Sequence, residues 1–100
     1  MRDLNNIKFV YNNEELCFKI SCYLRDGAVA IIIEAVYVYE TYATLTVNIP
    51  CTILEKDEIL VKTWSENEPI TDFLRNSEFF EDTGKRVPTG FVEAEIWRIK

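Results

Sequence analysis

The chain has 100 residues, of which 48% are hydrophobic and 28% charged, with a net charge of −6 and no histidine. This length fits one domain over residues 1–100 with a core of its own, and the composition excludes intrinsic disorder. The negative charge disfavours binding to nucleic acid or anionic lipid, and the missing histidine excludes serine–histidine and cysteine–histidine catalysis.

The first third of the chain has the signals of strands. Alternating apolar residues at 7–11 and 16–22 predict two strands joined as a hairpin through Asn12-Asn13. Asp26-Gly27 is a turn signal, and residues 28–36, AVAIIIEAV, are apolar at consecutive positions. That run predicts a central strand buried on both faces.

Two more strands are predicted in the middle of the chain. YATLTVNI, residues 42–49, alternates cleanly, which predicts a strand with Leu45 toward the core and Thr44 and Thr46 outward. EILVKTW, residues 58–64, predicts a fifth strand.

The one good helix start is SENEPITDFL, residues 65–74. Ser65 and Glu68 have the spacing of a capping box, and Asn67 as the N-cap is the alternative. In either register one narrow apolar stripe results, formed by Ile70, Phe73 and Leu74. The pattern predicts a helix of about three turns that packs on the sheet.

FVEAEIWRI, residues 91–99, alternates again and predicts the last strand. Five strands, one helix and one strand indicate an α+β domain, with an antiparallel sheet of about six strands and one short helix on it. Glu93 and Glu95 share a face of the last strand. They are interpreted as exposed strand residues rather than as a carboxylate pair for acid–base or metal chemistry.

Residues 81–90, EDTGKRVPTG, contain fragments of a phosphate-binding loop. A Walker A loop has the order GxxxxGK[ST] and leads into a helix, whereas Lys85 follows the first glycine and a strand follows the second. Gly84 and Gly90 therefore predict two turns. No nucleotide, metal or other cofactor is expected.

The three cysteines, Cys17, Cys22 and Cys51, cannot all pair within one chain, and without histidine their spacing is poor for zinc. They are interpreted as free, mostly buried thiols of a reducing compartment. Because the N-terminal MRDLNN lacks the apolar run of a secretory signal, the expected location is the cytoplasm.

Three stretches, YATLTVN, EILVKTWSENEPI and EDTGKRVPTGFVEAEI, resemble a family of small proteins known as a domain of unknown function. Phages, plasmids and integrative elements of gut and other Gram-positive bacteria carry this family. The resemblance covers residues 42–99, and its most specific motif is EDTG followed by VPTGF. The chain departs from the family at VYVYETY, which lacks a glycine-bearing turn. The resemblance implies a setting in mobile DNA, where small acidic proteins often inhibit host defences.

Two groups of residues are candidates for binding a partner. Carboxylates cluster at 55–58, at 66–72, where Glu66, Glu68 and Asp72 are the candidates, and at Glu78, Glu81 and Asp82. A solvated acidic face is favoured over mimicry of nucleic-acid phosphates, because eleven basic residues dilute the charge. The second group comprises tyrosines that fall on or beside one turn: Tyr37, Tyr39 and Tyr42. Tyrosine serves interfaces and cores equally well, so both interpretations stay open.

The leading hypothesis is a non-enzymatic inhibitor from a phage or mobile element, of the anti-CRISPR type. It would bind a basic host defence protein, such as a Cas effector, through an acidic and tyrosine-bearing surface. It would contact neither nucleic acid nor membrane directly. The alternative is an accessory or structural protein of the element that self-associates through a strand edge, for instance as a homodimer.

Overall fold

The computed structural model describes residues 3–100 and contains seven strands, a 3₁₀ turn and one α-helix. The elements in chain order are β1 (Lys8–Tyr11), β2 (Glu14–Cys22), β3 (Val29–Ala35), β4 (Glu40–Thr44), β5 (Glu58–Val61), η1 (Ser65–Asn67), α1 (Glu68–Leu74), β6 (Phe80–Thr89) and β7 (Val92–Ile99).

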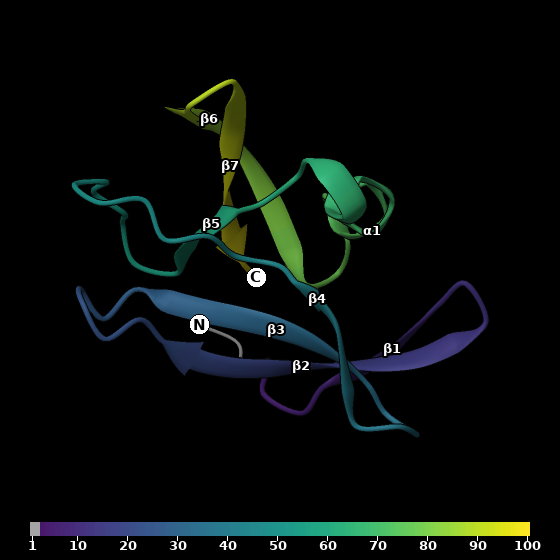
Figure 1. Cartoon of the computed structure of the whole chain (residues 1–100). Coiled ribbons are helices and arrows are strands. Elements are labelled where there is room, and N and C mark those ends of the chain that lie inside the picture. Colours follow the sequence, from purple (N-terminus) through teal and green to yellow (C-terminus); the bar gives the residue numbers. More distant parts are fainter. Residues whose placement is uncertain (1–2) are drawn as a thin grey trace.

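The strands form two antiparallel sheets rather than one. The first sheet has the order β1-β2-β3-β4 and the second has the order β5-β7-β6. In Figure 1, β6 and β7 run steeply across the direction of β2 and β3, and α1 lies beside the second sheet. The α+β class with antiparallel pairing is confirmed. The expectation of about six strands in a single sheet is wrong.

The N-terminal hairpin follows the predicted pattern. Asn12 and Asn13 have φ angles of 55° and 61°, and a two-residue turn of type I′ needs positive φ at both positions. Strand β3 is central in the first sheet, as predicted, but only one of its faces is fully buried. Ile32 and Glu34 on the other face are half-buried, because no helix or strand in residues 3–100 packs over the outer side of this sheet.

The chain passes from one sheet to the other just after β4. The Leu45 amide donates to Ile31 in the first sheet, and the Leu45 carbonyl accepts from Lys62 beside the second. Thr46, expected outward, is therefore buried. Its hydroxyl accepts from the Ile31 amide at 3.0 Å and is hydrogen-bonded to the Tyr23 hydroxyl at 2.9 Å. The predicted strand over residues 42–49 is thus divided between two sheets.

The helix begins at Glu68 with Asn67 in the N-cap position, as the alternative predicted, and the capping box of Ser65 and Glu68 does not form. Ser65 has a φ of 58° inside η1, and Asn67 makes no capping hydrogen bond. The Asn67 side-chain amide instead donates to the carbonyls of Thr44, at 2.7 Å, and Lys62, at 3.0 Å. This position ties the start of α1 to both sheets. The helix has seven residues, which is two turns rather than about three.

Residues 81–90, predicted as two turns, belong mostly to β6, which pairs with β7 over its length. The register shifts between Asp82 and Arg86, and Gly84, with a φ of 86°, lies inside that bulge. Proline is tolerated because β6 is an edge strand, where a missing N–H need not cost a ladder hydrogen bond. The second turn is confirmed at Gly90, with a φ of 63°.

Two apolar clusters lie on opposite faces of the second sheet. The larger fills the space between the sheets and α1, and its bulkiest members include Phe18, Phe80 and Trp97. The smaller consists of Leu60, Ala94 and Ile96, covered by side chains that include Val47 and Trp64. Both faces of β5 and β7 are therefore buried, which holds the second sheet rigidly in place.

Of the three thiols, only Cys17 is buried, whereas Cys22 and Cys51 are exposed, so the expectation of mostly buried cysteines is wrong. Cys22 is the last residue of β2. It alternates with the buried Leu16 and Phe18, but this end of the strand extends beyond the core. Within residues 3–100, no helix combines the length and apolar character needed to cross a bilayer.

Candidate functional site

Three aromatic rings form a half-exposed strip, here called the aromatic strip, where α1 meets the first sheet. It consists of Tyr11 on β1, Tyr42 on β4 and Phe73 on α1. The Tyr11 ring lies 4.9 Å from the Phe73 ring and 6.4 Å from the Tyr42 ring, measured between centroids. Phe73, predicted on the buried stripe of the helix, is 47% exposed, and Tyr42 is 39% exposed. The strip therefore offers aromatic area to solvent.

A β-bulge directs Tyr42 into this strip. Ile33 pairs with Ala43, and Glu34 pairs with Thr41, so Tyr42 is the extra residue of β4. Bulges re-aim side chains and are enriched beside functional sites. The two opposite edges of the first sheet thus approach each other closely enough for the rings of Tyr42 and Tyr11 to meet. Burial raises the pKa of the Tyr42 hydroxyl, and Tyr11 and Glu14 raise it further.

The other two candidate tyrosines lie on the turn between β3 and β4. Tyr37 is 78% exposed and Tyr39 is 85% exposed, so neither belongs to the core. The Tyr37 hydroxyl donates to Glu15 at 3.3 Å, and Tyr39 has a φ of 55°. Tyr39 also borders a cleft on the outer side of the first sheet. The structure therefore places Tyr37 and Tyr39 at the same end as Tyr42 but on a different side.

The three candidate carboxylates are exposed along η1 and α1. Lys62 is 3.0 Å from Glu66, and Arg75 is 2.8 Å from Asp72. The hydrogen bond from Lys62 lowers the pKa of Glu66. Glu68, the first residue of α1, has no ion pair within residues 3–100 and is the freest of the three to meet a partner. Asp72 directly precedes Phe73 in α1, but its carboxylate pairs with Arg75, which contacts the second sheet.

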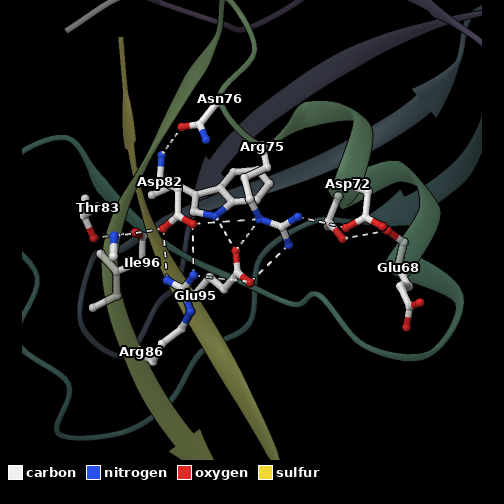
Figure 2. Close-up of polar contacts among 12 residues, drawn as sticks. Glu68, Asp72, Arg75, Asn76, Asp82, Thr83, Arg86, Glu95 and Ile96 are labelled. Carbon is white, nitrogen blue, oxygen red and sulfur yellow. Dashed lines mark hydrogen bonds and ion pairs between the residues drawn. The ribbon is translucent and has the colours of Figure 1, made fainter.

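A polar network that the sequence did not reveal holds the end of α1 on the second sheet (Figure 2). Arg75 donates to the two Glu95 carboxylate oxygens, at 2.9 and 3.1 Å. The Trp97 indole N–H donates to the same carboxylate at 2.9 Å, and the Arg75 guanidinium lies 5.9 Å from the centre of the Trp97 ring. Glu95, expected to be exposed, has a side chain only 13% exposed, whereas Glu93 is exposed.

Charge pairing in this network shifts the ionisation of its members. The hydrogen bonds that Arg75 donates to Glu95 and Asp72 raise the pKa of Arg75, so its guanidinium stays charged. Arg86 donates twice to Asp82, at 2.9 Å each, and this lowers the pKa of Asp82 against the opposing effect of burial. Every charge in the network has an opposite charge as its neighbour, which is typical of a structural clamp.

The basic residues of EDTGKRVPTG also bind carboxylates of the chain itself. The Lys85 ammonium lies 2.6 Å from a carboxylate oxygen of Glu58, whose side chain is fully buried, and Arg98 lies 3.7 Å from the same oxygen. Burial raises the pKa of Glu58, but the contacts with Lys85, the Glu55 amide and Arg98 outweigh it and lower the net pKa. Lys85 thus neutralises a buried acid. Within residues 3–100, no group of three or more Cys, Asp or Glu side chains is arranged to hold a metal ion.

The sequence missed Tyr11, Phe73 and the Arg75 network as parts of surface sites. Tyr11 and Phe73 have the spacing of core residues in their own elements, and only the packing of α1 across the first sheet brings them together. Arg75 and Glu95 are separated by 20 positions, and no local motif links them. A comparison with protein-family models, one with curated proteins and one with solved structures each returned no match.

Proposed function

We propose that this protein is a non-catalytic binding protein that docks onto a basic surface of a partner protein. The docking surface combines the aromatic strip with the exposed carboxylates of η1 and α1, Glu66, Glu68 and Asp72. Tyr37 and Tyr39 lie on a different side of the first sheet and are not part of this surface. The observation that carries the proposal is the bulge at Tyr42, which places a half-exposed tyrosine beside Tyr11, whose ring in turn contacts the half-exposed Phe73.

Aromatic side chains and charge fit this function in complementary ways. Tyr42 and Phe73 are already held by ring contacts, so burying them under a partner costs little conformational entropy. The net charge of −6 speeds the approach of a basic protein, with Glu68 among the exposed carboxylates at the surface itself. Such a surface anchors by its rings and steers by its charges.

The resemblance to proteins of mobile elements supplies the biological setting of the proposal. In that setting the partner is a basic nucleic-acid enzyme of host defence, a Cas effector being the first to test. The chain would act in the host cytoplasm by occupying the basic surface on which the enzyme holds nucleic acid. A plasmid-interference assay, with and without this protein, measures the inhibition directly.

Strand-edge self-association is less favoured by the arrangement of edges. The longest free edge, β6, is interrupted by a bulge and carries Pro88 with charged Lys85 and Arg86, all of which discourage pairing with another chain. Strand β1 has only four residues. A dimer that persists at low protein concentration, in the absence of any partner, would favour the alternative.

The charge arm of the test uses Glu68→Gln, with Glu93→Gln as its control. Both residues are exposed and have no ion pair in the described part of the chain, but Glu93 lies on β7 away from the strip. Against a basic partner, Glu68→Gln should slow association and reduce its salt dependence, whereas Glu93→Gln should do so less.

The aromatic arm uses Tyr42→Ala, with Leu24→Ala as its control. Leu24 is fully exposed on the turn between β2 and β3, so its removal deletes apolar area elsewhere. Tyr42→Ala should speed dissociation by about thirtyfold, since a desolvated anchor contributes about 2 kcal/mol. Tyr42→Phe should bind nearly as wild type. If a partner binds all these variants equally well, the surface is not the interface.

A further inference from the structure

A cleft of about 200 Å³ opens on the outer side of the first sheet, away from the aromatic strip. Its lining combines two ammonium groups, from Lys8 and Lys19, with the thiol of Cys17, the carboxylate of Glu34 and the ring of Tyr39. The cleft thus brings two lysines and one carboxylate together in a chain with a net charge of −6.

The strand register explains how these groups converge. Lys8 on β1, Cys17 on β2 and Glu34 on β3 are paired in one row across three strands. Lys19 follows Cys17 by two positions and therefore points to the same side. Lys8 and Lys19 are thus diagonal neighbours, roughly 7–8 Å apart at their Cα atoms, with the thiol between them. Their long side chains can converge on one tetrahedral anion.

Lys8 has one carboxylate within ion-pair distance, that of Glu15, and Lys19 has none among the described residues. The Lys19 ammonium donates to the side-chain oxygen of Asn6, and it forms no ion pair with any described residue. Lys8 lies 3.6 Å from Glu15 but is 62% exposed, so this pair is loose. Like charges on adjacent strands repel, and an anion held between the two lysines relieves that repulsion.

We propose that this cleft binds a small phosphate monoester. The phosphate lies between Lys8 and Lys19 because two point charges favour a dianion over a monoanion. Glu34, which has no ion pair in the described part of the chain, accepts a hydrogen bond from a hydroxyl of the ester. Tyr39 covers the carbon skeleton. The volume is below the roughly 300–1,000 Å³ of sites for drug-sized ligands, so a three- or four-carbon ester fits better than a nucleotide.

Amide chemical shifts of the ¹⁵N-labelled protein, titrated with glycerol 3-phosphate, test the proposal. Saturable shifts should gather at Lys8, Cys17, Lys19 and Glu34, with a dissociation constant of about 1 mM or tighter. Glyceric acid, which offers a monoanionic carboxylate, should bind at least about tenfold more weakly. Non-saturable shifts, or shifts spread evenly over all lysines, would refute the site.

The matched variants are Lys19→Gln and Lys56→Gln. Both lose one positive charge at a solvent-accessible position, but Lys56 lies on the turn before β5 and does not line the cleft. Lys19→Gln should weaken binding by about tenfold or more, and Lys56→Gln by less than about twofold. Equal losses in the two variants would show that only the overall charge matters, and would overturn the proposal. Glu34→Gln should reduce the ratio of the affinity for glycerol 3-phosphate to the affinity for inorganic phosphate.

A second readout does not depend on affinity. In a variant with Cys22→Ser and Cys51→Ser, both at exposed positions, Cys17 is the only thiol. Bound glycerol 3-phosphate should slow the reaction of Cys17 with iodoacetamide, because the ligand covers the cleft floor. A rate that is unchanged at saturating ligand would place the ligand elsewhere and contradict the proposal.

Discussion

Replacing Glu95 by alanine should destabilise the fold well beyond the usual cost of a surface substitution. The change removes two hydrogen bonds from Arg75 and one from the Trp97 indole, at a side chain that is 13% exposed. Hydrogen bonds to charged groups contribute about 1.5–3 kcal/mol each, but they do not add. Arg75 keeps its contact with Asp72 and is 27% exposed, so water and that carboxylate recover part of the loss. The expected loss in unfolding free energy is therefore about 2–3 kcal/mol.

Urea denaturation followed by tryptophan fluorescence measures this loss, and a thermal melt should show a midpoint lower by about 10–20 °C. Glu93→Ala is the matched control on the same strand, and its effect should stay within about 0.5 kcal/mol. Combining Glu95→Ala with Arg75→Met should cost less than the sum of the single changes, because the two side chains act on each other. A Glu95→Ala loss below about 0.5 kcal/mol, or strict additivity in the double variant, would refute the clamp.

Three further predictions concern Thr46, Gly84 and Asp82. Thr46→Val should lower the unfolding free energy by about 2 kcal/mol, because it leaves the buried Ile31 amide unpaired. Thr44→Val, at an exposed position, should change the unfolding free energy by less than about 0.5 kcal/mol, and equal losses for the two variants in urea melts would contradict the prediction. Gly84→Ala should cost about 1 kcal/mol through its φ of 86° alone, since the space around it is open, and a neutral result in the same melts would argue against the bulge conformation. Asp82 has a folded-state pKa below its ordinary value of 3.8, so its stabilising contribution is complete at neutral pH and is lost as pH falls through the folded pKa. The unfolding free energy, measured by urea denaturation from pH 5 down to pH 2, should therefore fall less steeply for Asp82→Asn than for wild type. If the two plots of unfolding free energy against pH are parallel, Asp82 makes no such contribution.

The elements that sequence alone predicted well are those fixed by neighbouring residues. The N-terminal hairpin combines alternating strands with an Asn-Asn turn that tolerates positive φ, so its register follows from about 15 consecutive positions. The helix start was also local, because Glu68 and Pro69 suit a first turn. The cap of the helix could not be predicted locally, because the Asn67 side chain donates to the backbone carbonyls of Thr44 and Lys62, which are distant from each other in sequence.

The features that the sequence did not predict depend on pairing between distant segments. Thr46 has the alternation of an outward residue, and only the passage of the chain to β5 buries it. Residues 81–90 contain turn formers, yet the side chains of Asp82 and Thr83 accept from the amides of Gly84 and Lys85 and so satisfy the bulge within a strand.

The candidate binding residues show the same division. Exposure of Tyr37 and Tyr39 follows from their position on a turn, although the sequence left a core role equally open. The ring contacts of Tyr42 and Phe73 with Tyr11 require a bulge and the placement of α1, neither of which has a local signature. Sequence reasoning therefore identified the tyrosines but not the strip that they form.

The passage of the chain at Leu45 has a consequence for how the molecule opens. One peptide segment donates to the first sheet through the Leu45 amide and accepts from beside the second through the Leu45 carbonyl. Separation of the two sheets therefore breaks a backbone hydrogen bond of Leu45 as well as the apolar core between them. The Leu45 and Lys62 amide hydrogens should therefore both exchange slowly with deuterium. The free energy of opening measured at each amide should equal that of global unfolding. The two sheets would then unfold together in one cooperative step, and neither would persist as a folded unit without the other.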